Sequence, residues 1–286
     1  MSTSPPPAWF SEALSHSPEQ HEISVDGIRI SYRTWGPAHA PPVVLIHGGA
    51  AHGGWWDHIG PNLAVKHRII AHHLSGHGDS DRRQNYSLGS WAAEAMAVAA
   101  AESSAPPILF GHSLGGLIAL TAATHADYDL RGTLAIDSSI TPLSEKRWSN
   151  LPGMNRREHT VYPDRETILS RYRTIPEDAA TLPFIRDHVA AGSIGQVAGG
   201  WSWKFDPAIF ATAPWWNPDA LLSVRGEVAL ILGRRGAADA DIEPFVRARF
   251  GDRISITVIE NSGHHVPLDQ PVELTSQLQQ LLERWS

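Results

Sequence analysis

The sequence ILFGHSLGGLIAL, residues 108–120, predicts a strand, a tight turn and a helix in immediate succession. It opens as an apolar run without polar alternation, which is typical of a strand buried on both faces of a parallel sheet. Residues 111–115 then match G-x-S-x-G, and the segment that follows is rich in leucine and alanine. In this context the pattern is typical of a turn that presents a nucleophilic serine, here Ser113.

Steric constraints explain why this turn contains glycines. Side chains two residues before and after Ser113 would collide with neighbouring backbone, and the serine itself must adopt a strained conformation. The start of the helix offers free N–H groups to an anion. The alternative is a serine that caps a helix beside packing glycines. The strand and the helix on either side favour the nucleophile.

Composition narrows the class of protein. The chain has 286 residues, 42% of them hydrophobic, enough for one large core with or without a smaller insert. The net charge of -7 and the lack of a basic stripe argue against nucleic acid as a partner. The absence of cysteine excludes disulfides, zinc–thiolate sites and a cysteine nucleophile. A polar, proline-rich start and no apolar run of membrane-spanning length predict a cytoplasmic protein.

Strand and helix signals alternate along most of the chain. A hairpin is predicted around Asp26-Gly27. Further strands are predicted at residues 43–46, 68–74, 108–110, 132–137, 227–233 and 254–259. This alternation predicts an α/β fold, with a mostly parallel eight-stranded sheet and helices on both faces. Ligands of such sheets bind beyond the carboxyl ends of the strands.

The connection between Asp137 and Glu227 is unusually long. It spans about 90 residues without an obvious strand, and a connection of this length is usually a functional insert. Its tryptophans are Trp148, Trp201, Trp203, Trp215 and Trp216. We expect a hydrolase-like core at residues 1–140 and 223–286, with a helical cap at residues 141–222.

Four motifs together resemble the α/β-hydrolase fold family, in its cap-bearing branch of serine esterases and C–C hydrolases. They are His47-Gly48-Gly49, Gly76-His77-Gly78-Asp79-Ser80, residues 111–115, and Gly263-His264 followed by Pro271. The resemblance covers nearly all residues from 21 to 286. It implies a cofactor-free serine hydrolase in which the chain order is serine, acid, histidine.

The resemblance assigns two members of a catalytic triad directly. Ser113 is the nucleophile, and His264 follows the last strand at the position of the family's base. The adjacent His265 could be mistaken for the base, but the Gly-His spacing favours His264. For His265 the alternative is a contact with solvent or with the cap.

The triad acid is not at its usual place. The family most often carries it three residues past a glycine after the penultimate strand, and that position is Gly236. Asp239 and Asp241 lie farther along the same loop. Other members carry the acid after the strand that follows the elbow helix, where this chain has Asp137. The sequence therefore favours Asp137, with Asp239 left open and a turn or hinge role as the alternative for Asp137.

The remaining site residues follow from the same comparison. The N–H groups of Leu114 and Gly49 are expected to form the oxyanion hole. Trp201 and Trp203 are the first candidates for an apolar substrate pocket, with Trp55 and Trp56 as equal candidates and burial in the core as the alternative.

Many histidines cluster in the first third of the chain, but their spacing matches no helical metal-binding pair. We expect no metal and no cofactor. His47 is expected to support the oxyanion loop and His112 to be structural. His73 stands where the family usually has aspartate, which leaves a local hydrogen-bond network uncertain.

Taken together, the sequence predicts a serine hydrolase that cleaves a small to medium hydrophobic carboxyl ester through an acyl-enzyme. A C–C bond hydrolase or a lactonase on the same triad is an alternative. A ligand receptor or signalling homologue with slow turnover is another. The motifs do not give the natural substrate, the pathway or the oligomeric state.

Overall fold

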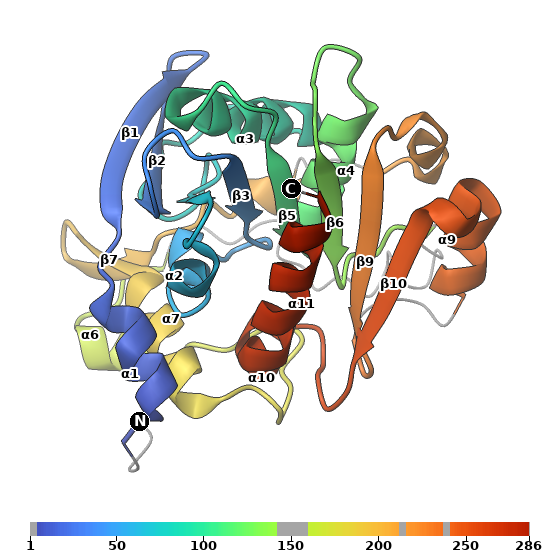
Figure 1. Cartoon of the computed structure of the whole chain (residues 1–286). Helices are drawn as coiled ribbons and strands as arrows, with labels where there is room; N and C mark the ends of the chain where they lie inside the picture. Colours follow the sequence, from blue (N-terminus) through green and yellow to red (C-terminus); the bar gives the residue numbers. More distant parts are fainter. Residues whose placement is uncertain (1–4, 142–159, 212–215, 237–240, 286) are drawn as a thin grey trace.

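Figure 1 shows the computed structural model, which describes residues 5–141, 160–211, 216–236 and 241–285. Its main feature is an eight-stranded sheet with the strand order β1-β2-β4-β3-β5-β6-β9-β10. The strands are β1 (Glu19–Val25), β2 (Ile28–Trp35), β3 (Pro42–Ile46), β4 (Arg68–His72), β5 (Ile108–His112), β6 (Gly132–Ile136), β9 (Glu227–Gly233) and β10 (Ile254–Ile259). From β4 to β10 all neighbouring strands are parallel, which confirms the predicted mostly parallel sheet.

The two antiparallel strands lie at one edge. β1 pairs with β2 around Asp26 and Gly27, whose φ angles are 52° and 77°. Both values are in the left-handed region that a tight hairpin turn requires. β2 in turn pairs antiparallel with β4, so the predicted hairpin joins the parallel sheet through its second strand.

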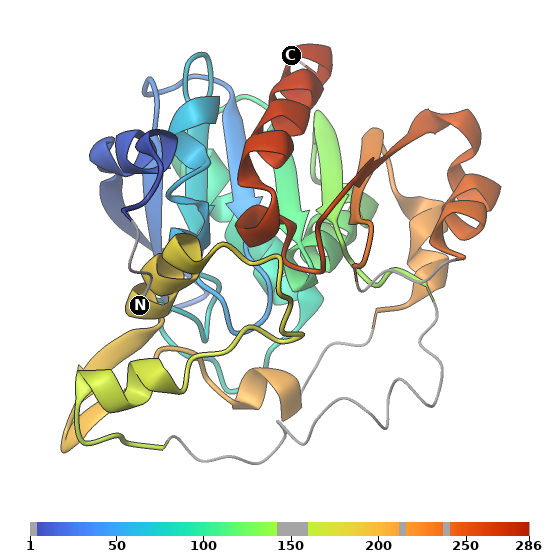
Figure 2. The same ribbon diagram turned by 90° about the horizontal axis from the view of Figure 1, so that it is seen from below.

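Helices cover both faces of the sheet (Figures 1 and 2). One face packs against α2 (Gly60–Leu63) and α11 (Pro271–Trp285), and the other against α3 (Leu88–Glu102), α4 (Leu114–Thr124) and α9 (Ile242–Phe250). Residues alternate between the faces: in β3, Val43 and Leu45 belong to the first layer, and Val44 and Ile46 to the second. This two-sided burial explains the continuous apolar runs of the central strands.

The long connection between β6 and β9 contains helices and a small sheet. Its described residues form α6 (Arg165–Ser170), α7 (Pro183–Gly192), β7 (Ile194–Val197), β8 (Gly200–Trp203), α8 (Ala208–Ala211) and the 3₁₀ helix η3 (Pro218–Ser223). The antiparallel pair β7–β8 was not part of the expected helical segment. Its two-residue turn includes Gly199 at φ 85°, a conformation that glycine adopts without strain. Trp148 and Trp215 lie outside the described residues.

Side-chain contacts join this insert to the sheet domain on both sides. Lys204 Nζ lies 2.5 Å from Asp79 Oδ1, and the Tyr86 hydroxyl donates to Asp206 Oδ2 at 2.8 Å. Near α7, Asp57 Oδ2 lies 3.0 Å from His188 Nε2. The insert therefore packs over the edge of the sheet where β3, β4 and β5 end.

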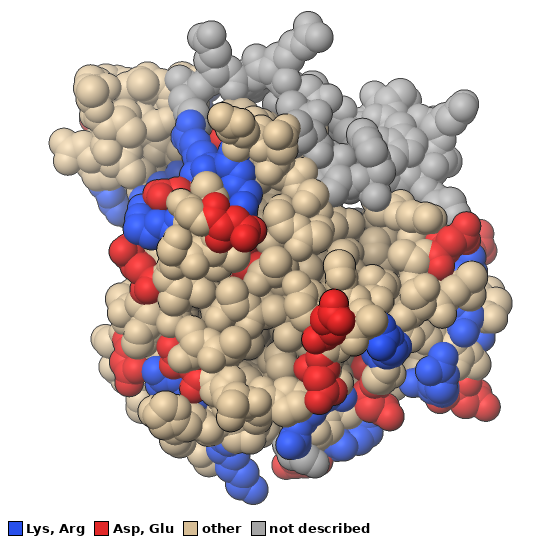
Figure 3. All heavy atoms as spheres, turned by 90° about the horizontal axis from the view of Figure 1, so that it is seen from above, with Lys and Arg blue, Asp and Glu red and all other residues tan. Residues whose placement is uncertain are grey.

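Four further short elements lie outside the sheet and the insert in the described part of the chain. They are α1 (Ala8–Ser15), the 3₁₀ helices η1 (Gly53–Trp56) and η4 (Gly251–Arg253), and α10 (Val266–Asp269). On the face drawn in Figure 3, charged side chains of both signs are scattered over a largely uncharged surface. Among the described residues, no helix combines the length and the apolar character needed to cross a membrane.

Candidate active site

The turn between β5 and α4 holds Ser113 in a strained backbone conformation, with φ 53° and ψ -116°. Its N–H donates to the carbonyl of Ile136 at 2.9 Å, which fixes the turn to the neighbouring strand β6. A Cβ at Gly111 would lie 2.1 Å from the Gly115 oxygen, and one at Gly115 would lie 2.3 Å from the Ile46 oxygen. Both glycines are therefore required by close backbone approach, as the sequence predicts.

Ser113, His264 and Asp137 form a continuous chain of hydrogen bonds. His264 lies in the loop between β10 and α10, with Nε2 3.0 Å from Ser113 Oγ and Nδ1 2.7 Å from Asp137 Oδ2. A carboxylate can only accept, so Nδ1 carries the proton and Nε2 presents a lone pair to the serine hydroxyl. This is the tautomer that a general base needs.

Asp137 is held rigidly where β6 ends. It is fully buried and has a φ of 46°. Its N–H donates to the Ile231 carbonyl at 2.7 Å, and its Oδ1 accepts from the Gly233 N–H at 3.1 Å. Both partners belong to the adjacent strand β9, so the sheet itself aims the carboxylate at His264.

Gly236 leaves room for this carboxylate. A Cβ at position 236 would lie 1.9 Å from Asp137 Oδ1. The usual family position of the acid and the position of Asp137 thus converge on one volume, which the Asp137 carboxylate fills. Asp241 is exposed at the start of α9, and Asp239 lies outside the described residues.

The residues expected to supply the two oxyanion donors, Gly49 and Leu114, lie close together. A Cβ at Gly49 would be 3.7 Å from Leu114 Cδ2. Leu114 is the first residue of α4, where N–H groups have no partner within the helix. Throughout the described ranges, no backbone carbonyl accepts from the N–H of Leu114 or Gly49. One free N–H at the start of a helix and a second in an adjacent loop can stabilise a developing oxyanion.

His47 supports the loop that carries Gly49. Its Nδ1 donates to the Gly48 carbonyl at 2.7 Å, and its Nε2 accepts from the Leu74 N–H at 3.2 Å. Complete burial holds the pKa of His47 well below the ordinary value, so the ring is neutral and able to accept. The oxyanion loop is therefore tied to the turn that follows β4.

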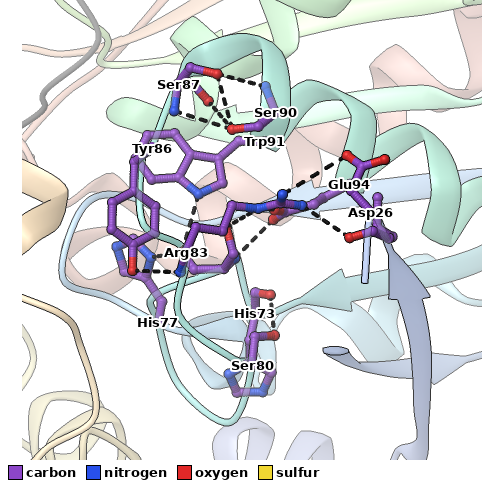
Figure 4. Close-up of polar contacts among 12 residues, drawn as sticks. Asp26, His73, His77, Ser80, Arg83, Tyr86, Ser87, Ser90, Trp91 and Glu94 are labelled. Atoms are coloured by element: carbon purple, nitrogen blue, oxygen red, sulfur yellow. Dashed lines mark hydrogen bonds and ion pairs between the residues drawn. The ribbon is translucent and has the colours of Figure 1, made fainter. Parts of the chain in front are cut away.

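That turn is itself tied to α3 by a buried ion pair (Figure 4). Arg83 Nε donates to Glu94 Oε1 at 2.8 Å, and the Ser75 N–H donates to the second carboxylate oxygen at 2.8 Å. The Trp91 indole N–H donates to the Ser75 carbonyl at 3.2 Å. His73, at the family's aspartate position, accepts from the Asp79 N–H at 3.4 Å and so retains a hydrogen bond across the turn.

Two further histidines lie beside His264. His112 Nε2 donates to the His264 carbonyl at 2.8 Å, and burial holds the pKa of His112 well below the ordinary value. His265 Nε2 donates to the Pro176 carbonyl of the insert at 3.1 Å, and burial lowers the pKa of His265 to about 3. Trp55 stacks on His112 with ring centroids 6.0 Å apart.

The tryptophans expected in the pocket, Trp201 and Trp203, lie on β8 of the insert. Trp201 pairs with Tyr162 through two backbone hydrogen bonds of 2.8 Å, and the Trp203 ring contacts Tyr162 and Tyr172. The ring of Phe210 lies 3.4 Å from the Cβ position of Gly49. Phe210 was not predicted, because no spacing in the sequence relates the short helix α8 to the oxyanion loop.

Comparison with known proteins relates this chain to α/β hydrolases. The sequence profile described as "Alpha/beta hydrolase family" matches residues 43–277. Esterase Rv0045c of Mycobacterium tuberculosis is 30% identical over 258 residues, which are 85% of this chain and 82% of that protein. Non-heme chloroperoxidase of Burkholderia pyrrocinia is 34% identical over 133 residues, so the match spans 45% of this chain and about half (48%) of that protein's length.

Solved structures share the fold at lower sequence identity. E-2-(Acetamidomethylene)succinate hydrolase superposes with a TM-score of 0.78 at 20% identity, over 93% of this chain and 100% of that chain. The thioesterase domain from the curacin biosynthetic pathway gives a TM-score of 0.77 at 21% identity, over 92% of this chain and 99% of that chain.

Proposed function

Because the chain belongs to the alpha/beta hydrolase family, we propose that it is a serine hydrolase that cleaves a hydrophobic carboxyl ester of small to medium size. One observation carries the proposal: the unbroken chain of hydrogen bonds from Ser113 Oγ through His264 to the buried carboxylate of Asp137. These are the nucleophile, base and orienting acid that acyl transfer requires.

The acylation step follows from this geometry. Ser113 Oγ attacks the ester carbonyl while His264 Nε2 takes the hydroxyl proton, and Asp137 stabilises the imidazolium that forms. The N–H groups of Leu114 and Gly49 donate to the oxyanion, and each such donor contributes about 3 kcal/mol of transition-state stabilisation. His264 then protonates the leaving alcohol, which departs and leaves an acyl-serine.

Water completes the cycle. His264 takes a proton from a water molecule that attacks the acyl-serine carbonyl, and the same donors hold the second oxyanion. The C–O bond to Ser113 then breaks, and the proton returns to Ser113 Oγ. The acid is released and the triad is restored without a cofactor.

The apolar surroundings of the serine support a hydrophobic substrate. Leu114, Leu117, Phe210 and Trp216 are partly buried and pack against the layer that holds α3 and α4. Partly exposed apolar side chains next to a nucleophile are typical of an acyl-binding pocket. We propose that residues 141–222 act as a cap over this pocket, with Phe210 of the cap placed beside Gly49.

An ester-hydrolysis assay tests the proposal. The purified chain should hydrolyse short-chain p-nitrophenyl esters, and Ser113→Ala should lower kcat by about 10⁴-fold or more, because the nucleophile is lost. Thr121→Ala, on the same helix but outside the triad, is the control. Equal rates for the wild type and Ser113→Ala would overturn the proposal, and no turnover of any ester, lactone or diketone would favour a receptor.

A further inference from the structure

Three buried imidazoles meet beside the nucleophile: His112, His264 and His265. One ring nitrogen from each lies within 4.8 Å of those of the other two. Their ring centroids are 5.0, 5.7 and 4.9 Å apart for the pairs 112–264, 112–265 and 264–265. The cluster brings together two segments that are more than 150 residues apart in the sequence.

Hydrogen bonds fix the tautomer of all three rings. His264 Nδ1 faces the Asp137 carboxylate, His112 Nε2 faces the His264 carbonyl, and His265 Nε2 faces the Pro176 carbonyl. Each of these oxygens can only accept, so each of these nitrogens carries the proton. The other nitrogen of each ring is therefore left with a lone pair.

Two of these lone pairs lack a partner. His112 Nδ1 and His265 Nδ1 are buried, and no group among the described residues hydrogen-bonds to them. The two side chains are only 2% and 5% exposed. An unpaired buried acceptor costs free energy and calls for a physical explanation. The protein thus keeps two unsatisfied nitrogen lone pairs next to His264.

We propose that this cluster is an inhibitory binding site for a transition-metal dication of the zinc class. The ligands are His112 Nδ1, His264 Nε2 and His265 Nδ1. Neutral imidazole nitrogens suit such ions. Tetrahedral Zn–N bonds of about 2.0–2.1 Å place ligand nitrogens about 3.3 Å apart, so ring movements of about 1 Å close the site.

The outer hydrogen bonds match those of metal-binding histidines. A ligating imidazole almost always donates its other N–H to a carboxylate or a backbone carbonyl, which orients the ring and raises its basicity. Here the acceptors are Asp137 Oδ2 and the carbonyls of His264 and Pro176. An ion on His264 Nε2 takes the place of the contact that this nitrogen makes with Ser113 Oγ at 3.0 Å.

Metal binding and proton transfer compete for one lone pair. A dication on His264 Nε2 occupies the electrons that would accept the Ser113 proton, so the serine cannot be activated. The inhibitory effect rests on the proposed hydrolase function, whereas the binding site itself does not. The expected inhibitor is a zinc-class ion that is removed by a chelator.

Calorimetric titration of the full-length chain with ZnCl₂ tests the binding site. The wild type should bind one equivalent at this site. His112→Gln and His265→Gln should each weaken binding by about tenfold or more, because each removes a ligand. His125→Gln, at an exposed position, is the matched control and should bind as the wild type does. Circular dichroism checks that each variant is folded.

Asp137→Asn adds a test that removes no ligand. Loss of the outer acceptor of His264 should weaken zinc binding by about 10–100-fold. If the wild type binds zinc and neither histidine variant changes this binding, the proposed site is wrong. So would the absence of binding in a folded wild type.

The inhibitory effect is measured separately. Zinc should suppress ester hydrolysis by the wild type, and EDTA should restore it. In the two histidine variants, normalised to their own metal-free rates, about tenfold more zinc should be needed. Zinc binding without any ester hydrolysis would refute the proposed function and leave the metal site standing. Hydrolysis by a chain that zinc binds at this site but does not inhibit would refute the inhibitory role.

Discussion

Gly236 and Asp137 compete for one small volume beside His264. The Asp137 carboxylate lies where a side chain at position 236 would begin. The absence of a side chain at position 236 is therefore part of the active-site geometry, although Gly236 does not contact substrate. It permits the 2.7 Å hydrogen bond that orients the base.

Gly236→Ala is expected to displace the Asp137 carboxylate from His264, because the new Cβ would lie 1.9 Å from Asp137 Oδ1. We predict that kcat for ester hydrolysis falls toward the level of Asp137→Asn, which should lose about 10⁴-fold. Steady-state kinetics of the two variants measures this. Gly89→Ala is the control, because the nearest atom to its Cβ position is 3.9 Å away. An unchanged kcat in Gly236→Ala would show that Asp137 does not orient the base.

At the scale of single residues, the sequence predicted the features that lie within short segments. It missed the contacts between segments that are far apart in the chain. The glycine pattern around Ser113 and the Gly-His pair at residues 263–264 are short motifs, and both can be read directly. The proximity of Phe210 to Gly49, and of His112 to His265, depends on how distant segments pack. No periodicity or spacing records such contacts.

Among the secondary-structure elements, the turn after β4 depends on α3. Glu94 lies in the middle of α3, is fully buried, and accepts from both Arg83 and the Ser75 N–H. The same turn supplies the Leu74 N–H that His47 accepts. A helix that carries none of the candidate triad residues thereby holds the loop that presents Gly49.

Glu94→Ala should destabilise the protein by about 3–5 kcal/mol, because it leaves the Arg83 guanidinium, only 11% exposed, without its buried counter-charge. Urea denaturation followed by circular dichroism measures the loss. The exposed pair between Glu243 and Arg247 on α9 is the matched control, and Glu243→Ala should cost less than about 0.5 kcal/mol. Equal effects of the two substitutions would contradict this account.

The strands were predictable from the sequence where their side chains are buried in a regular pattern. Strands β3 to β6 are buried at every position, and their apolar runs indicated this. The hairpin β7–β8 was missed because its burial pattern is irregular and half of β7 is exposed. The hairpin packs against the rest of the insert and pairs there through the backbone of Trp201 and Tyr162. These contacts are not visible in its local sequence pattern.

Across the whole molecule, buried neutral histidines make stability depend on pH. Burial lowers the pKa of His52, His58 and His77 to about 4, and that of His72 to about 3. In the unfolded chain these rings have a pKa of about 6.5 and bind protons that the folded rings do not. Their contribution to stability is complete above pH 6.5 and is lost as the pH falls toward 4.

The free energy of unfolding should therefore drop steeply between pH 6.5 and 5. Each buried ring contributes up to about 1.4 kcal/mol per pH unit in this window. His72→Leu removes one such ring, whose two nitrogens have no partner in the described part of the chain, and should flatten the slope. Urea midpoints from pH 8 to 5 measure it, with the exposed His125→Gln as control. A slope that His72→Leu leaves unchanged would rule out this origin.

The architecture as a whole was the most predictable level. The alternation of strands and helices led to the correct sheet, because both patterns arise from the same burial of its two faces. The strand ends alone predict that the insert lies near the serine. How its residues pack there could not, since the contacts of Phe210, Pro176 and His188 with the sheet domain are all long-range.

The shared volume of Gly236 and Asp137 also bears on how such a chain could have arisen by descent. On this backbone the two positions cannot both carry a side-chain carboxylate while Asp137 keeps its present rotamer, since a Cβ at position 236 would overlap the Asp137 carboxylate. Relatives that retain aspartate at the position of Gly236 should carry a residue other than a His-directed aspartate at the position of Asp137.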